Sequence, residues 1–310
     1  MIVAAEAATD PTRHAPSPLR TIVVATDFSP NAAMARAWGE QIARADRALL
    51  VLVHAFNGPS SAPELVRWPS EYDDHIRSHV QSQLARQAEI ARSNGAEVEA
   101  ELGFGAAPDV VAASAERRGA DLIVTGTRSR TAWKRRLLGS TAARLIRAAH
   151  CPVLTVHTKP APRRIRTALV GTDFSEAAAL AAETAARLFD TPAADRRLVL
   201  LHAYQVPYEA RYVPAPVLMD AISAAETTVN RMIEERAQNL RAAGIKVDTV
   251  TCEGAPSEAI VRYADSLGAD VIALGTHGRS ALDRFVLGSN AERVITSASC
   301  PVLTIGSGVA

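Results

Sequence analysis

The sequence contains one long pattern twice, and this repetition restricts the fold more than any other feature. The segment IVVATDFS at 22–29 returns as ALVGTDFS at 168–175, with an offset of 146 between the two aspartates. Farther along, GADLIVTGT at 119–127 matches GADVIALGT at 268–276 with an offset of 149. Because the offset drifts by so little over a whole half, the pattern indicates two copies of one domain rather than a solenoid of short repeats.

A chain of 310 residues has room for two domains of ordinary size. We expect a disordered tail over 1–18, one domain over 19–158 and a second domain over 165–310. The stretch TKPAPRR at 158–164 is rich in proline and basic residues, which is typical of a linker.

Within each half, apolar runs of strand length alternate with helical segments. In the first half the pattern predicts strands over 21–25, 48–55, 98–102, 121–125 and 152–156. It predicts helices over 30–45, 70–93, 109–117 and 140–149. Ser29 before Pro30 is typical of a helix start, and Asn94 before Gly95 of a helix end.

Strands separated by helices indicate a parallel sheet with helices on both faces. The fold class is therefore α/β, with two tandem doubly wound five-stranded domains. In such folds a ligand binds at the carboxyl ends of the strands, near the point where the strand order reverses.

The last strand of each half is apolar and carries no charged residue. These strands read PVLTV at 152–156 and PVLTI at 301–305. A strand at a solvent-exposed sheet edge is usually protected by charge. We therefore expect the two strands to meet, so that the halves pack as an internal pseudo-dimer.

Composition excludes several function classes. Lys plus Arg number 34 and Asp plus Glu 33, a balance that argues against a nucleic-acid partner. No apolar run approaches the ~20 residues of a membrane-spanning helix, and no signal peptide is recognisable, so we expect no membrane partner. Cys151, Cys252 and Cys300 form neither a disulfide framework nor a metal-ligand spacing, and fit buried positions in a cytoplasmic protein.

Polar residues follow the first and second strands of each half. Thr26-Asp27-Phe28-Ser29 recurs as Thr172-Asp173-Phe174-Ser175. The aspartate either complements the positive end of the following helix or faces a hydroxyl or base edge of a ligand; its recurrence favours the ligand. His54 and His202 close the second strands, and we interpret them as structural because no nucleophile pattern accompanies them.

Spaced glycines follow the fourth strand of each half. The second half reads Gly275-Thr276-His277-Gly278, nine residues, then Gly288-Ser289-Asn290; the first half reads Gly126-Thr127-Arg128-Ser129, nine residues, then Gly139-Ser140-Thr141. Glycine permits close approach of a phosphate, and a helix start attracts an anion. The alternative is a glycine-containing loop with a serine N-cap. Neither segment is a P-loop or a dinucleotide fingerprint.

Basic residues lie between the spaced glycines. Lys134-Arg135-Arg136 in the first half is matched by Asp283-Arg284-Phe285 in the second, so only the middle residue stays basic. Such a run is usually a solvated face, but Arg135 and Arg284 could also reach phosphates.

In combination, the T-D-F-S turn, the G-x-x-G-(nine)-G-S spacing and the C-P-V-L strand closely resemble the universal stress protein family, once per half over 20–306. The resemblance implies the five-stranded fold that is similar to the adenine-nucleotide alpha-hydrolases. It also implies ATP or AMP as ligand, with Mg²⁺ as an optional companion. It implies nucleotide-binding roles for Ala25, Thr26, Asp27, Ala55, Gly126, Arg128, Ser129, Gly139, Ser140, Thr141, Gly171, Thr172, Asp173, Ala203, Gly275, His277, Gly278, Gly288, Ser289 and Asn290. Ser129 departs from the glycine pattern, which predicts weaker binding in the first half.

Three functions fit these features. The chain is a stress-responsive nucleotide sensor or regulator, a slow ATPase or phosphotransferase, or a partner-binding scaffold with incidental nucleotide. Phosphoryl transfer needs positioned metal ligands, and the pattern offers one carboxylate per site and no metal site, so we expect no catalytic residue. The sequence leaves a further homodimer of the whole chain open.

Overall fold

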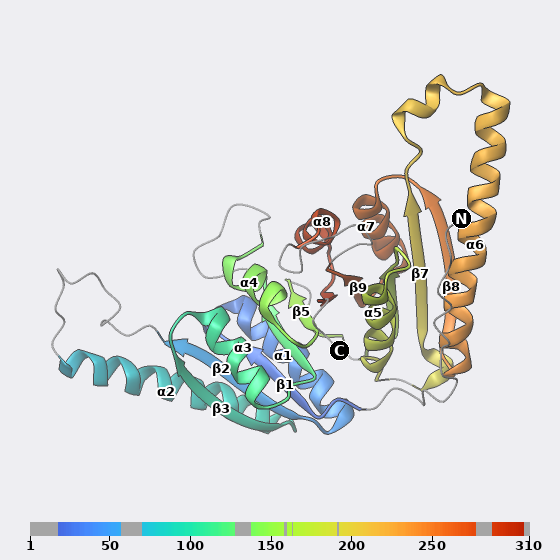
Figure 1. Cartoon of the computed structure of the whole chain (residues 1–310). Helices are drawn as coiled ribbons and strands as arrows, with labels where there is room; N and C mark the ends of the chain where they lie inside the picture. Colours follow the sequence, from blue (N-terminus) through green and yellow to red (C-terminus); the bar gives the residue numbers. More distant parts are fainter. Residues whose placement is uncertain are drawn as a thin grey trace, which may run out of the picture.

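In the computed structural model the protein is described over residues 18–56, 70–127, 138–157, 160–162, 164–190, 192–276 and 287–306. The expected tail at 1–18, apart from Pro18, falls outside the described residues, and so do positions 158, 159 and 163 of the expected linker at 158–164. Figure 1 shows the two halves side by side, the first coloured from blue to green and the second from yellow to red.

Each half alternates strands with helices, as the sequence predicts. The first half contains β1 (Thr21–Ala25), α1 (Pro30–Asp46), β2 (Leu49–Phe56), α2 (Ser70–Ser93), β3 (Glu97–Phe104), α3 (Ala107–Arg117), β4 (Leu122–Gly126), α4 (Ser140–Ala148) and β5 (Val153–Val156). The second contains β6 (Thr167–Gly171), α5 (Glu176–Arg187), η2 (Ala193–Asp195), β7 (Arg197–Tyr204), η3 (Tyr208–Tyr212), α6 (Ala215–Ala242), β8 (Lys246–Glu253), α7 (Pro256–Leu267), β9 (Val271–Gly275), α8 (Ser289–Ser297) and β10 (Val302–Ile305). The expected strands and helices of the first half are confirmed, although β3 is longer than predicted.

The strands of both halves form one sheet in the order β3-β2-β1-β4-β5-β10-β9-β6-β7-β8. Pairing is parallel inside each half. The chain runs outward from β1 to β2 and β3, then crosses back to β4 on the other side of β1. The strand order therefore reverses between β1 and β4, and likewise between β6 and β9, which are the positions where doubly wound sheets bind ligands.

The two halves join through their last strands. β5 and β10 pair antiparallel, with Leu154 opposite Leu303. The Thr155 hydroxyl donates to the Val302 carbonyl oxygen at 3.0 Å, and the Thr304 hydroxyl donates to the Val153 carbonyl oxygen at 3.1 Å. These reciprocal bonds satisfy polar groups at a buried junction, and the expected pseudo-dimer is confirmed.

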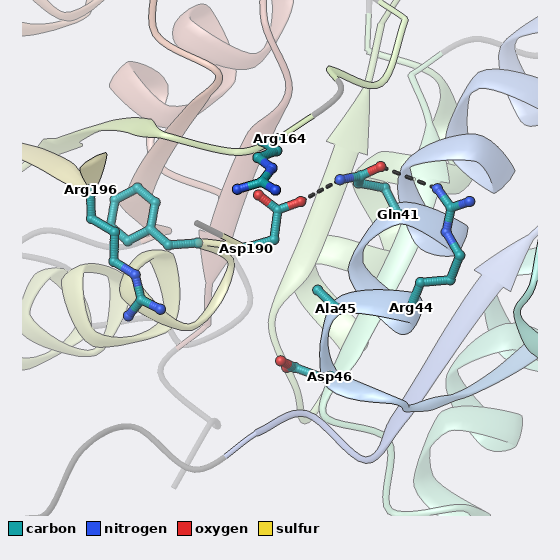
Figure 2. A pocket seen from close by; sticks show the side chains of 8 residues that line it. Gln41, Arg44, Ala45, Asp46, Arg164, Asp190 and Arg196 are labelled. Atoms are coloured by element: carbon teal, nitrogen blue, oxygen red, sulfur yellow. Dashed lines mark hydrogen bonds between the residues drawn. The ribbon is translucent and has the colours of Figure 1, made fainter. Parts of the chain in front are cut away.

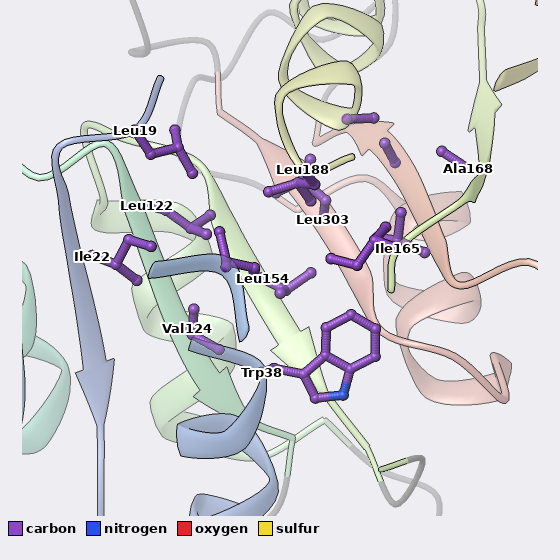
Figure 3. Packing of buried hydrophobic residues seen from close by; sticks show 14 of the residues in the cluster. Leu19, Ile22, Trp38, Leu122, Val124, Leu154, Ile165, Ala168, Leu188 and Leu303 are labelled. Carbon is purple, nitrogen blue, oxygen red and sulfur yellow. The ribbon is translucent and has the colours of Figure 1, made fainter. Parts of the chain in front are cut away.

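Helices cover both faces of the sheet, and alternate strand residues serve different faces. Ile22 and Val24 pack in one buried cluster with residues of α1 and α2, whereas Val23 packs in another with residues of α3 and α4. The first cluster continues across the junction. Figure 3 shows the Trp38 indole of α1 in the same cluster as Leu303 of β10.

Trp38 should be a main support of this shared core. Its side chain is fully buried, so Trp38→Ala should lower the free energy of unfolding by about 3–5 kcal/mol, because a large cavity would remain. Urea denaturation of the full chain measures the loss. Val217→Ala is the control, since Val217 is 58% exposed and its truncation should cost far less. Equal losses for the two variants would contradict the assignment.

Candidate functional site

A compact turn links β1 to α1 at the carboxyl edge of the sheet. The Thr26 hydroxyl oxygen accepts from the Phe28 N–H at 3.2 Å, and Oδ1 of Asp27 accepts from the Ser29 N–H at 3.0 Å. The Ser29 hydroxyl oxygen then caps α1 by accepting from the Ala32 N–H at 3.2 Å. Phe28 adopts φ 61°, in the left-handed region that side chains other than glycine rarely occupy.

The second half repeats this turn bond for bond. The hydroxyl of Thr172 and the carboxylate of Asp173 accept at 3.1 and 3.0 Å, Ser175 caps α5 at 3.2 Å, and Phe174 has φ 65°. The aspartate thus has the helix-entry role that the sequence allows. A carboxylate has about four lone-pair sites on its two oxygens, so the bond to the serine N–H does not by itself exclude a bond to a ligand. The ligand-facing role therefore stays a compatible prediction.

A histidine from the neighbouring strand supports each turn. His54 Nδ1 lies 2.7 Å from the Thr26 carbonyl oxygen, and its ring stacks on Phe28 with 4.4 Å between centroids. His202 repeats both contacts, at 2.8 Å from Thr172 and 4.6 Å from the Phe174 ring. Because a carbonyl only accepts, Nδ1 carries the proton in both rings. The structural interpretation of the histidines is confirmed.

The two phenylalanines of these turns belong to the site, although the sequence pattern was not interpreted in that way. Phe28 and Phe174 occupy the left-handed position of each turn, and each ring packs against the histidine of the neighbouring strand, stacked at Phe28 and tilted at Phe174. The signal available was their recurrence between an aspartate and the serine that caps the helix.

The second strand of each half extends beyond the end of the first strand, and its backbone faces the space beside the Thr-Asp turn. The register of β1 and β2 ends at Ala25 and Val53, and the Thr26 N–H donates to the Val53 carbonyl oxygen at 2.9 Å. Ala55 lies two residues farther along β2, so its N–H and C=O point to the same side, past the end of β1. Ala203 holds the matching place, since the Thr172 N–H donates to the Leu201 carbonyl oxygen at 2.9 Å.

The glycines that end the strands serve packing. A Cβ on Gly275, at the end of β9, would lie 2.9 Å from Ala177 Cβ in the first turn of α5. On Gly126, at the end of β4, it would lie 3.3 Å from Asn31. On Gly171, the last residue of β6, it would come within 2.7 Å of Leu274 and Ile260. The space beside these three glycines is therefore filled by the protein, which explains them without a ligand.

Helices α4 and α8 begin close to these strand ends with glycine caps. Gly139 and Gly288 are the N-cap residues, and no side-chain bond caps either helix. Their N–H groups donate to Thr127 and Thr276 carbonyl oxygens at 2.9 and 2.8 Å, which fixes both helix starts against the sheet. The alternative of a serine N-cap is therefore wrong, because Ser140 and Ser289 lie one residue inside the helices.

An uncapped helix start presents N–H groups and the positive end of the helix dipole. Ser140 and Thr141 in α4, and Ser289 and Asn290 in α8, occupy these first turns, and all but the half-buried Thr141 are exposed. Because β4 pairs with β1, and β9 with β6, each helix start belongs to the same sheet edge as a Thr-Asp turn.

The remaining candidate positions lie outside the described residues. These are Arg128, Ser129, His277, Gly278, Arg135 and Arg284. Within the described ranges no group of three or more His, Cys, Asp or Glu side chains is arranged to hold a metal ion. In that part of the chain, too, no helix is both long and apolar enough to cross a membrane.

The cysteines fit the packing interpretation where the structure tests it. Cys300 is buried, and Cys151 and Cys252 are partly buried. Burial raises the pKa of the Cys151 thiol to about 12, so this side chain stays protonated and poorly nucleophilic at neutral pH.

A family model for universal stress proteins matches residues 18–157 and again 164–306. The chain belongs to the universal stress protein family. Universal stress protein Rv2005c of Mycobacterium tuberculosis is 31% identical over 297 residues, which cover 91% of this chain and 95% of the relative. Universal stress protein Rv2623 of the same organism is 29% identical over 299 residues, with the same coverage.

A solved universal stress protein from Archaeoglobus fulgidus shares the fold. It superposes with a TM-score of 0.67 at 20% identity, covering 93% of this chain and 97% of the other. The two-half architecture is therefore found in a protein whose sequence has diverged widely, and the expected fold class is confirmed.

The packing role of two of the three strand-end glycines can be tested. Gly275→Ala should destabilise the protein by about 1–3 kcal/mol, because the new methyl group would push α5 away from β9. Gly126→Ala should cost less, since its nearest neighbour is 3.3 Å away. Urea titrations give both values. A Gly275→Ala protein as stable as wild type would show that the helix start yields freely.

Proposed function

We propose that this universal stress protein binds an adenine nucleotide, ATP or AMP, in each half and acts as a stress-responsive sensor or regulator in the cytoplasm. The main support is an arrangement that occurs in both halves at the carboxyl ends of the strands. An extended second strand, a Thr-Asp turn and an uncapped helix start lie around the point where the strand order reverses. The family's name supports a role in stress.

The nucleoside would occupy the space past the end of the first strand. The backbone N–H and C=O of Ala55 or Ala203 face that space and suit the donor and acceptor edge of adenine. Thr26 or Thr172 lies beside it. The carboxylate of Asp27 or Asp173 is an acceptor, which suits a ribose hydroxyl.

The phosphates would lie at the uncapped helix starts. In the second half, the start of α8 supplies N–H groups and polar side chains from Gly288, Ser289 and Asn290. In the first half, the start of α4 supplies them from Gly139, Ser140 and Thr141. His277 and Gly278 in the second half, and Arg128 and Ser129 in the first, would complete the two cradles, as the sequence pattern predicts. A Mg²⁺ ion would be held mainly by the phosphates, since the described residues offer it no carboxylate cluster.

Binding rather than turnover is the proposed activity because each site has a single carboxylate. Nucleotide that co-purifies with the full chain, identified by ultraviolet absorbance and mass spectrometry, tests binding. A turnover assay with Mg²⁺ then separates a sensor from a slow ATPase. If the purified protein carries no nucleotide, and if titration with ATP or AMP releases no heat of binding, the proposal is wrong and the partner-binding scaffold is the remaining function.

Asp173 should contribute to affinity and not to hydrolysis. Asp173→Asn keeps an oxygen for the Ser175 N–H but removes the charge, so ATP affinity should fall roughly 10- to 150-fold, as for a lost charge-assisted hydrogen bond. Calorimetric titration measures it. Asp248→Asn on β8 removes the same charge away from the site and should bind normally. Normal affinity with a lost ATPase rate would instead make Asp173 a catalyst.

The second half should bind more tightly than the first. Gly278→Trp should remove most binding in the second half, whereas Ser129→Gly should strengthen the first half, because it restores the glycine of the spacing. Stoichiometry and affinity from nucleotide titration decide this. Two equal sites in the wild-type protein, or a Gly278→Trp variant with unchanged stoichiometry and affinity, would refute the difference.

A further inference from the structure

The start of α6 is an exposed helical segment that projects beyond the rest of the second half. Figure 1 shows its first turns extending past the ends of β7 and β8. The Tyr204 hydroxyl at the end of β7 donates to the Glu226 carboxylate of α6, so the residues before Glu226 lie past the end of that strand. The first buried side chain of α6 is Ile233, so the helix runs about five turns from Ala215 before it meets the core.

Apolar side chains dominate this exposed segment. Four of the seven large apolar side chains that are exposed among the described residues lie within 212–219. They are Tyr212, Val213, Val217 and Met219, with exposed fractions of 74%, 39%, 58% and 64%. Over the sequence from 212 to 225, Asp220 is the only charged residue. A contiguous apolar surface of this kind is typical of a protein–protein contact.

The matching helix of the first half begins with a different composition. α2 reads SEYDDHIR over 70–77, which includes four charged residues, whereas α6 reads APVLMDAI over 215–222, which includes one. Because the two halves are copies of one domain, the fold itself does not require the apolar residues at the start of α6. They therefore point to a contact that only the second half makes.

One side of this helix start carries no charged residue. Val217, Ala221 and Ala224 lie on that side, since they are spaced four and three residues apart, and all three are exposed. Apolar residues at this alternating spacing form the seam along which a second helix packs. Met219 lies on the opposite side of the helix, next to Ser223.

We propose that this uncharged side of α6 pairs with the same side of α6 in a second copy of the chain, as two antiparallel helices. A pair centred between Ala221 and Ala224 sets Val217 opposite Thr228 of the second copy and Asp220 opposite an alanine, so that no two charged residues meet. Because the contact surface is the same on both copies, association closes at a dimer.

The size of the surface fits a weak, reversible dimer. The side chains of Tyr212, Val213, Val217, Ala221 and Ala224 expose roughly 400 Å² per copy. A pair therefore buries roughly 800 Å², below the about 1,200 Å² at which stable interfaces begin, and we expect a dissociation constant of roughly 1–100 μM. A strongly charged partner is disfavoured, because the surface would offer it a single charge. In dilute protein the chain is a single copy, so the pairing adds nothing to a urea titration there.

Sedimentation velocity of the full chain without nucleotide, at concentrations on both sides of this range, tests the proposal. The wild type should pass from one copy to two as the concentration rises. Val217→Glu and Ala221→Glu should each weaken the pairing at least about tenfold, because each buries a carboxylate without a partner. Met219→Glu is the matched control: it adds the same charge to the same helix start on the opposite side, and should weaken the pairing less than about twofold.

Hydrogen exchange at low and high protein concentration locates the contact. Amides within 212–228 should exchange more slowly in concentrated protein, whereas those of α2 should not change. A single copy at every concentration would overturn the proposal and assign the surface to a different protein. A dimer that Val217→Glu and Ala221→Glu weaken no more than Met219→Glu does would also overturn it, since the copies would then meet elsewhere. Thermal unfolding of dilute protein verifies that each variant folds.

Discussion

The antiparallel pairing of β5 with β10 is the interaction on which the rest of the architecture depends. Both strands are fully buried and apolar, and the hydroxyls of Thr155 and Thr304 satisfy carbonyl oxygens across the junction. Without this pairing each half would expose an uncharged edge, a ready template for aggregation. With it, ten strands form one sheet and one continuous core on the face that holds Trp38.

The outer edges of the same sheet show the opposite composition. β3 carries Glu97, Glu99 and Glu101, and the last two pair with Arg118 of the loop after α3. At the other edge, Asp248 of β8 pairs with Arg197 at 2.8 Å. Charged side chains protect an edge strand from pairing with another chain. The charged outer strands therefore disfavour the addition of further strands, whereas the uncharged inner strands β5 and β10 favour pairing with each other.

The duplicated halves share their turns but differ where they meet. Trp38 of α1 has Thr184 as its counterpart in α5, and His157 after β5 bonds to the Ile295 carbonyl of α8 through Nε2. A homodimer has identical surfaces at such a contact, whereas a fused pair can specialise each side. The hydrogen bond from the Gln41 amide of α1 to the Asp190 carboxylate that follows α5 is a product of that freedom (Figure 2).

The sequence by itself determined the repeat, the alternation of strands and helices, the capping serines and the buried partnership of the last strands. These follow from neighbouring residues: Ser29 caps the helix of Pro30, and an uncharged PVLT strand requires a partner. Tertiary structure alone decided why Gly275 is glycine and which residues of the two halves meet. Residues 41 and 190 are in contact because the strand order and the twist of the whole sheet bring the ends of α1 and α5 together. Neither the strand order nor the twist can be derived from the residues that neighbour these two positions in the sequence.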